Sequence, residues 1–198
     1  MTDTIKAWHF VADRLRDGRP IPRDGAWLRH DGPVEICVSG LHASRRPWHA
    51  LQYAPGAVLC YVECRGDIHE QDDKFVCRER RILVRADVTE TLHYFARMQA
   101  LSAVHLWHEC PPGVVLDYLM TGEESIRDVA WAAAMESGME DGWGAAKVAT
   151  RSAAWAASRM AAWVTALAAA NSAAWSAARD AAGAEFDALI REQFGVAA

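Results

Sequence analysis

The sequence predicts an α+β protein in which a small β-rich N-terminal domain precedes an Ala/Trp-rich helical C-terminal region. Short runs of β-branched and aromatic residues, separated by proline and glycine, dominate the chain up to residue 87. After residue 87 the apolar residues follow helical spacing, and the last third is rich in alanine, the strongest helix former. We therefore expect a β-rich α+β domain at 1–87, connecting helices at 88–121 and an Ala/Trp-repeat helical region at 122–198.

Several short apolar runs of the first domain are predicted to be strands. They cover residues 5–11, 26–28, 34–38 and 57–63, with one or two more strands within 74–84. The run at 57–63 is the most apolar of the first half, so we expect it to be the central strand. Residues 47–53 are predicted to form a short helix with Pro47 in its first turn and Ser44 as its cap.

The helical part begins with predicted helices at 88–104 and 111–120. Two glycines at 138 and 142 are expected to end one helix and begin another. The rest of the tail is expected to form two or three packed helices, with one unbroken helix as the alternative. Apolar residues regain an amphipathic pattern at the C-terminal end, where we expect a docked terminal helix: Phe186, Leu189, Ile190 and Phe194.

Tryptophans recur through the alanine-rich tail at intervals that are multiples of four. They are Trp131, Trp143, Trp155, Trp163 and Trp175, spaced by 12, 12, 8 and 12 residues. A four-residue step advances about 400° around a helix, so the indoles wind around it instead of forming one stripe. Each indole can bury roughly 150 to 250 Å². We therefore expect the tail to need a packing partner, and we place partner-binding residues at Trp143, Trp155, Trp163 and Trp175.

Composition and charge exclude several classes of function. The formal net charge is −5, with 15 Lys/Arg against 16 Asp/Glu in residues 1–121 and 6 against 10 in residues 122–198. A non-specific nucleic-acid binder would have a basic excess, so nucleic acid is not an expected partner. Charged residues interrupt the alanine-rich tail before about 20 apolar residues accumulate, so no membrane span is expected. The five cysteines fit free thiols in a cytoplasmic protein.

Four arginines form a local basic cluster: Arg78, Arg80, Arg81 and Arg85. On a strand, Arg78 and Arg80 share one face, and we place partner binding there. The alternative is a solvated edge strand that charge protects from aggregation.

A possible metal motif is His105-x-x-His108-x-Cys110, in which two imidazoles three residues apart share a helix face. The usual zinc spacings are absent, so we expect the histidines to flank a buried Trp107 and predict no metal. Cys60 and Cys64 are expected to be buried free thiols, because their spacing along a strand is too long for an easy disulfide.

Several motifs resemble an uncharacterised family of actinobacterial phage and prophage proteins. They are Ile36-Cys37-Val38-Ser39-Gly40-Leu41-His42-Ala43, Ala50-Leu51-Gln52-Tyr53-Ala54-Pro55-Gly56, Val62-Glu63, Asp73-Lys74-Phe75-Val76, His105-Leu106-Trp107, Tyr118-Leu119 to Thr121-Gly122, and the Ala/Trp/Arg/Asp tail repeats. The resemblance covers nearly the whole chain and identifies no activity. It implies a phage-type accessory gene, and such genes often encode small proteins that bind and disable a host enzyme or immune complex.

The order of blocks in the first half also resembles ADP-ribosyltransferases of the poly-ADP-ribose polymerase type. The blocks are Trp8-His9, Gly40-Leu41-His42-Ala43, a helix with Tyr53, the strand at 58–63, and Lys74-Phe75-Val76. The resemblance implies that His9 and His42 hold the nicotinamide end of NAD. The family's glutamate falls at Asp73 or Lys74, and Lys74 there would remove the carboxylate. The alternative is that His42 caps a turn over the sheet.

The sequence therefore favours a binding protein over an enzyme. The expected function is inhibition of a host bacterial enzyme or antiviral defence complex, in the manner of an anti-CRISPR protein, in the cytoplasm of the host. No cofactor or catalytic residue is assigned in this interpretation. The competing hypotheses are NAD-dependent transfer through His9, His42 and Tyr53, and self-assembly of a structural homo-oligomer through the tail.

Overall fold

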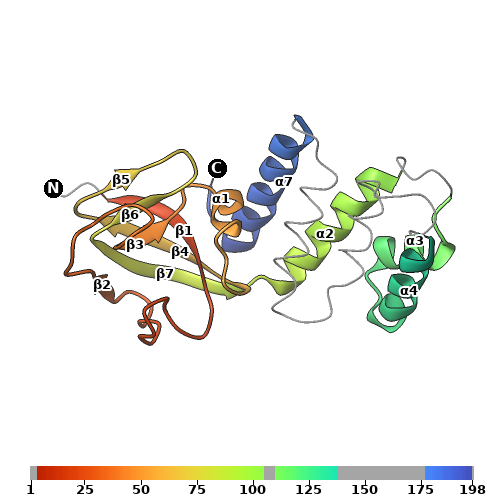
Figure 1. The fold of residues 1–198 in the computed structure, drawn as a ribbon, viewed down its shortest axis with the longest axis horizontal. Coiled ribbons are helices and arrows are strands. Elements are labelled where there is room, and N and C mark those ends of the chain that lie inside the picture. The colour runs from red at the N-terminus through yellow and green to blue at the C-terminus, as the bar shows by residue number, and fades with distance from the viewer. Residues whose placement is uncertain (1–3, 105–109, 138–176, 198) are drawn as a thin grey trace. The chain divides into compact units, whose positions relative to one another are not determined.

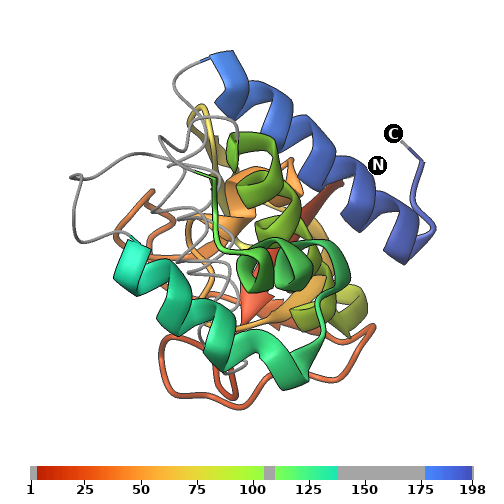
Figure 2. The same ribbon diagram turned by 90° about the vertical axis from the view of Figure 1, so that its right-hand side faces the viewer.

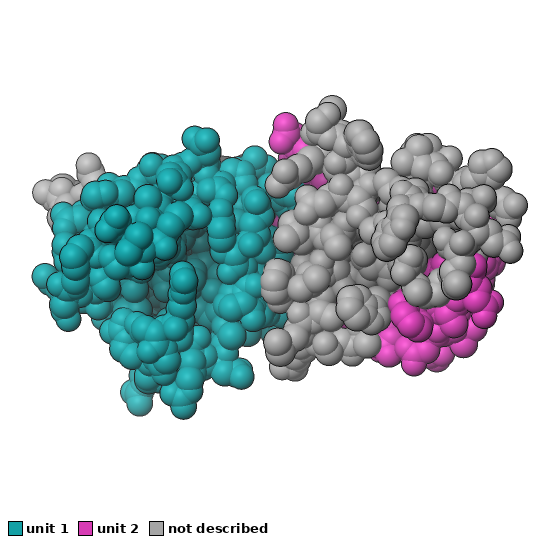
Figure 3. All heavy atoms as spheres, viewed as in Figure 1, with its two compact units in different colours: residues 1–88, 190–198 teal, residues 89–189 magenta. Residues whose placement is uncertain are grey.

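The computed structural model describes residues 4–104, 110–137 and 177–197 (Figure 1). The chain divides into two compact units, one of residues 1–88 and 190–198 and the other of residues 89–189 (Figure 3). All described strands belong to the first unit, and the second is helical where it is described. This arrangement of an antiparallel β region followed by helices confirms the predicted α+β class.

A four-stranded antiparallel sheet forms the larger part of the first unit (Figure 1). Its strands lie in the order β1 (Ile5–Val11), β4 (Val58–Arg65), β7 (Glu79–Asp87) and β2 (Trp27–Arg29). The predicted central position of the apolar run at 57–63 is confirmed, since β4 has paired neighbours on both sides. A bulge between Tyr61 and Val62 shifts the register of β4 against β7.

A second, three-stranded antiparallel sheet consists of β3 (Leu41–Ala43), β6 (Phe75–Cys77) and β5 (His69–Glu70), in that order. Its link to the first sheet is a two-bond bridge in which the amide of Trp8 donates to the Ser44 carbonyl at 2.8 Å and the amide of Ser44 donates to the Trp8 carbonyl at 2.9 Å. Apolar side chains from both sheets share one core cluster, which includes Ala7, Val62, Phe75 and Ile82.

Aromatic rings pack around Trp8 of β1. The indole of Trp8 is 1% exposed and lies with its ring centroid 4.7 Å from that of Tyr61 and 5.2 Å from that of Phe194. Phe194 is the last residue of α7 (Ala177–Phe194), the long helix in Figure 2. The short helix α1 (Pro47–Leu51) also belongs to this unit and begins at proline, as predicted.

The second unit contains α2 (Thr89–Ala103), α3 (Gly113–Thr121), the 3₁₀ turn η2 (Glu124–Ile126), α4 (Arg127–Ser137) and the first part of α7. Helix α3 ends at Gly122, whose φ of 70° gives a left-handed C-cap. The ring centroids of Phe95 on α2 and Phe186 on α7 lie 5.1 Å apart, and both side chains are fully buried. The predicted amphipathic end of the tail is thus confirmed at Phe186 and Ile190.

The expected strand at 34–38 is wrong. Residues 35–39 form a turn, in which the amide of Glu35 donates to the Ser39 carbonyl and the amide of Ser39 donates to the Glu35 carbonyl, both at 2.9 Å. Cys37 has a φ of 65°, and Val38 is 69% exposed. The segment satisfies its backbone locally, and so its β-branched residues gain no partner strand.

Two smaller expectations are also wrong. Ser44 does not cap α1, because its backbone pairs with Trp8 and the N-cap residue is Arg46, whose side chain makes no capping hydrogen bond to the helix. The arginine cluster does not share an edge strand: Arg80 and Arg81 lie where β7 pairs with both β4 and β2, Arg78 precedes β7, and Arg85 lies beyond the β2 pairing.

Within the described ranges, no helix has the length and apolar character needed to cross a membrane. The tryptophans at 143, 155, 163 and 175 lie outside the described residues, as do the proposed break at 138–142 and the choice between one long helix and several shorter ones.

Candidate functional site

A buried arginine marks the interior of the first unit. Arg80 is the second residue of β7, faces the core between the two sheets and is only 6% exposed. Its Nη1 donates a hydrogen bond to the backbone carbonyl of His42. No carboxylate among the described residues forms an ion pair with it. Burial lowers the pKa of Arg80, because a charged guanidinium is poorly solvated there.

Three buried free thiols surround this guanidinium: Cys60, Cys64 and Cys77. Burial raises the pKa of Cys60 to about 11. Cys64 and Cys77 share a hydrogen bond, which raises the pKa of Cys64 and lowers that of Cys77. The Sγ of Cys77 also lies 3.2 Å from the Leu41 carbonyl oxygen. The prediction that Cys60 and Cys64 are core thiols is confirmed.

His9 and His42 lie within electrostatic range of each other and of Arg80. Burial, then Arg80, then His42 hold the pKa of His9 well below its ordinary value. Burial is also the main cause of the lowered pKa of His42, to which Lys74, Arg80 and Arg16 contribute. Both imidazoles are therefore neutral near pH 7.

Hydrogen bonds select one tautomer of His42. Its Nε2 accepts from the backbone amide of Cys37 at 3.0 Å, and a backbone hydrogen bond to Gly40 occupies the ring as well. Nε2 is thus the unprotonated nitrogen, and Nδ1 carries the proton. The ring does hold a turn against the sheet, the alternative role we considered for it.

A polar trio lies nearer the surface. Tyr53 donates its hydroxyl hydrogen to the carboxylate of Asp73, and the Nζ of Lys74 donates to the Tyr53 hydroxyl at 3.2 Å. The ammonium of Lys74 also lies 4.3 Å from the centre of the Tyr53 ring, a cation–π geometry. Burial and the bond to Asp73 raise the pKa of Tyr53, so the phenol stays protonated.

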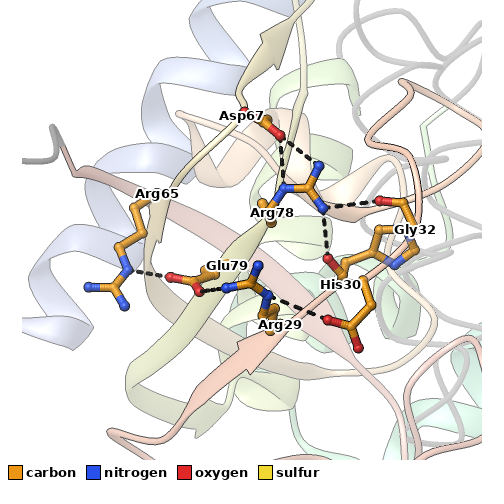
Figure 4. Close-up of polar contacts among 8 residues, drawn as sticks. Arg29, His30, Gly32, Arg65, Asp67, Arg78 and Glu79 are labelled. Carbon is orange, nitrogen blue, oxygen red and sulfur yellow. Dashed lines mark hydrogen bonds and ion pairs between the residues drawn. The ribbon is translucent and has the colours of Figure 1, made fainter.

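Ion pairs cross the outer face of the four-stranded sheet (Figure 4). Glu79 accepts from Arg65 of β4 and from Arg29 of β2, with the Arg29 contact at 3.1 Å. Arg78 is equally occupied, since it donates to Asp67 at 2.6 and 2.8 Å and to the carbonyls of His30 and Gly32, each at 3.1 Å. Trp27 lies under two guanidinium groups, 3.8 Å from that of Arg65 and 4.8 Å from that of Arg81.

The predicted site residues fall into two groups. His9, His42, Tyr53, Arg78 and Arg80 belong to the same unit, and His9, His42 and Arg80 are close enough to influence one another electrostatically. Arg78 and Arg80 were placed together as partner-binding residues, but all three nitrogens of the Arg78 guanidinium already donate hydrogen bonds and the guanidinium of Arg80 is buried.

Four predicted partner-binding residues lie outside the described residues: Trp143, Trp155, Trp163 and Trp175. The same holds for His105 and His108 of the metal motif considered above, and its third member, Cys110, is exposed. In the part of the chain that is described, no three His, Cys, Asp or Glu side chains are grouped to hold a metal ion.

Sequence reasoning missed the Trp27 stack and the bonding of Tyr53 to Asp73 and Lys74. Both depend on residues 20 or more positions apart, which only the tertiary fold brings together.

Acidification is expected to weaken the first unit through His9. Because its pKa is lowered in the folded state, the unfolded chain binds a proton below about pH 6.5 that the folded state does not. Stability is therefore full above pH 6.5 and falls by about 1.4 kcal/mol at one pH unit below it for this group alone. Urea unfolding between pH 7.5 and 5 measures this loss.

A His9→Gln variant is expected to flatten the pH dependence, and His69→Gln, which changes an exposed residue on β5, is the matched control. An unchanged slope in His9→Gln would show that this imidazole is free to protonate in the folded protein.

In a comparison with protein families, residues 5–94, which are less than half of the chain, match the model of a domain of unknown function, DUF7666. The DUF7666 region spans every described strand, α1 and the beginning of α2, and it includes His9, His42 and Arg80. No curated protein and no solved structure matches the chain.

Proposed function

We propose that the protein is a phage-type accessory factor that acts by binding another protein in the cytoplasm of its bacterial host. In this proposal it inhibits a host enzyme or an antiviral defence complex, as anti-CRISPR proteins do. The phage-type origin rests on the sequence motifs quoted above. The binding role rests on one structural observation on α4.

Helix α4 buries small side chains and exposes larger apolar ones. Among the side chains of α4 that the structure describes, the fully buried ones are Ala130 and Ala134, both 0% exposed, whereas Val129 is 60% and Trp131 is 37% exposed. An ordinary amphipathic helix buries its large apolar residues. Trp131 is the first tryptophan of the repeat, so its exposure supports a tail whose alanines pack and whose indoles remain available. Tryptophan is enriched among the residues that dominate binding energy at interfaces.

The test combines capture from a bacterial lysate with a mass measurement in solution. We expect one stoichiometric host protein to be retained by the wild type and lost from Trp131→Ala and from a Trp155→Ala/Trp163→Ala double variant. Met120→Ala on α3 is the matched control, because Met120 is also apolar and 60% exposed. Equal capture by all four proteins would remove the indoles from the proposal. Light scattering on the same samples tests the self-assembly hypothesis, which requires a mass above 21.8 kDa.

A second candidate function is NAD-dependent ADP-ribosyl transfer, and the proximity of His9, His42 and Arg80 favours it over other enzymatic activities. An enzyme of this kind releases nicotinamide from NAD and loses that activity in His9→Ala. Absence of nicotinamide release from the wild type would remove this candidate.

A further inference from the structure

The interior of the first unit holds a cation whose hydrogen-bonding capacity is mostly unused. A guanidinium has five N–H donors, and the described residues satisfy Arg80 through Nη1 alone, at the His42 carbonyl. Among the described residues, the one side-chain nitrogen or oxygen that is sealed from solvent without a partner is Nε2 of His93. Nε and Nη2 of Arg80 are not among such sealed atoms, so both still reach solvent although the residue is 94% buried.

The charged groups around Arg80 do not neutralise it. The cations that act on the two imidazoles are Arg80 on His9, and Lys74, Arg80 and Arg16 on His42. The groups that favour the Arg80 charge are the three thiols described above. Three carboxylates of the first unit serve other partners: Asp73 accepts from Tyr53, Glu63 pairs with Arg81, and Asp24 pairs with Arg85.

A buried guanidinium without a carboxylate is costly unless an anion compensates it. Arginine suits oxyanions in particular, because its planar fork donates parallel hydrogen bonds to two oxygens. His9 and His42 lie beside it, and Lys74 adds a partly exposed cation next to His42. These are the components of an oxyanion site with one buried anchor and one cation at its rim.

We propose that Arg80, with His9, His42 and Lys74, forms a binding site for a phosphate-class oxyanion, either free or as part of a larger phosphorylated molecule. The anion accepts hydrogen bonds from the free donors of Arg80, and Lys74 contributes attraction at the rim. This site lies in the DUF7666 region and does not depend on the tryptophan-mediated binding proposed above.

The experiment is a titration of the full-length protein with sodium phosphate, followed by NMR of the arginine Nε–H and histidine ring signals. Sodium chloride keeps the ionic strength constant. We expect saturable shifts at Arg80 and His9, and at least a tenfold weaker affinity in Arg80→Lys, which keeps the charge but loses the fork. Arg78→Lys is the matched control, since all three nitrogens of the Arg78 guanidinium already donate hydrogen bonds within the protein, and it is expected to bind phosphate like the wild type.

Lys74→Met provides a second variant at the edge of the site if Arg80→Lys does not fold, and at least a threefold loss of affinity is expected. A nucleoside diphosphate is titrated in parallel: tighter binding than inorganic phosphate assigns the site to a phosphorylated molecule, and equal or weaker binding assigns it to the free anion. Non-saturating shifts in the wild type, or equal losses in the Arg78 and Arg80 variants, would overturn the proposal.

Discussion

Replacing Gly40 with alanine is expected to destabilise the first unit by about 3 to 5 kcal/mol. Gly40 has a φ of +110°, which side-chain-bearing residues rarely adopt. An added Cβ would also lie 2.4 Å from Cγ2 of Val76, a buried β-branched residue that has few rotamers to move into. The backbone strain and the clash with Val76 add to each other, so we expect β3 and its His42 to be displaced.

Gly18→Ala is the matched control for this experiment. Gly18 has a φ of +83° but nothing within 4 Å of the added Cβ. Backbone strain is therefore the one expected cost to stability, about 1 to 2 kcal/mol. Urea unfolding compares the two variants, and native-state hydrogen exchange at the β6 amides reports on the first unit alone. Equal losses in the two variants would show that Val76 moves aside without cost.

Truncating Trp8 to alanine is expected to cost about 3 to 5 kcal/mol, the usual range for a fully buried aromatic residue. The change removes the ring that contacts both Tyr61 and Phe194, so it opens a cavity between β1 and the end of α7. Urea unfolding measures the loss of stability.

Trp27→Ala is the control, because Trp27 is only partly buried and stacks on guanidinium groups. We expect it to cost about 1 kcal/mol. A loss for Trp8→Ala as small as that for Trp27→Ala would mean that Tyr61 and Phe194 collapse into the vacated space.

The sequence was sufficient for elements whose local pattern and tertiary role agree. The strands at 5–11 and 57–63 were predictable because their apolar residues are buried in the structure, and Pro47 set the start of α1. The run at 34–38 failed because β propensity describes a half-buried pleated surface, and this segment lies between Pro33 and Gly40 with no neighbouring strand to pair with.

The candidate site could be predicted only in part. His9 and His42 were singled out together, and the structure brings them into electrostatic range of each other. The burial of Arg80 could not be foreseen, because a one-residue change in the start of β7 would send its side chain to the opposite face of the sheet. The bend at Arg78, between β6 and β7, puts Arg78 in a separate network from Arg80.

The contact of Trp8 with Phe194 has a consequence for biosynthesis. The first unit needs residues 190–198 for completion, yet its strands are finished by residue 88. At ~5–20 residues per second, a ribosome needs about 5 to 20 s to add the intervening segment. During that time the nascent sheet lacks the helical turn that covers its tryptophan, so newly made chains are open to chaperones and to aggregation until translation reaches the last helix.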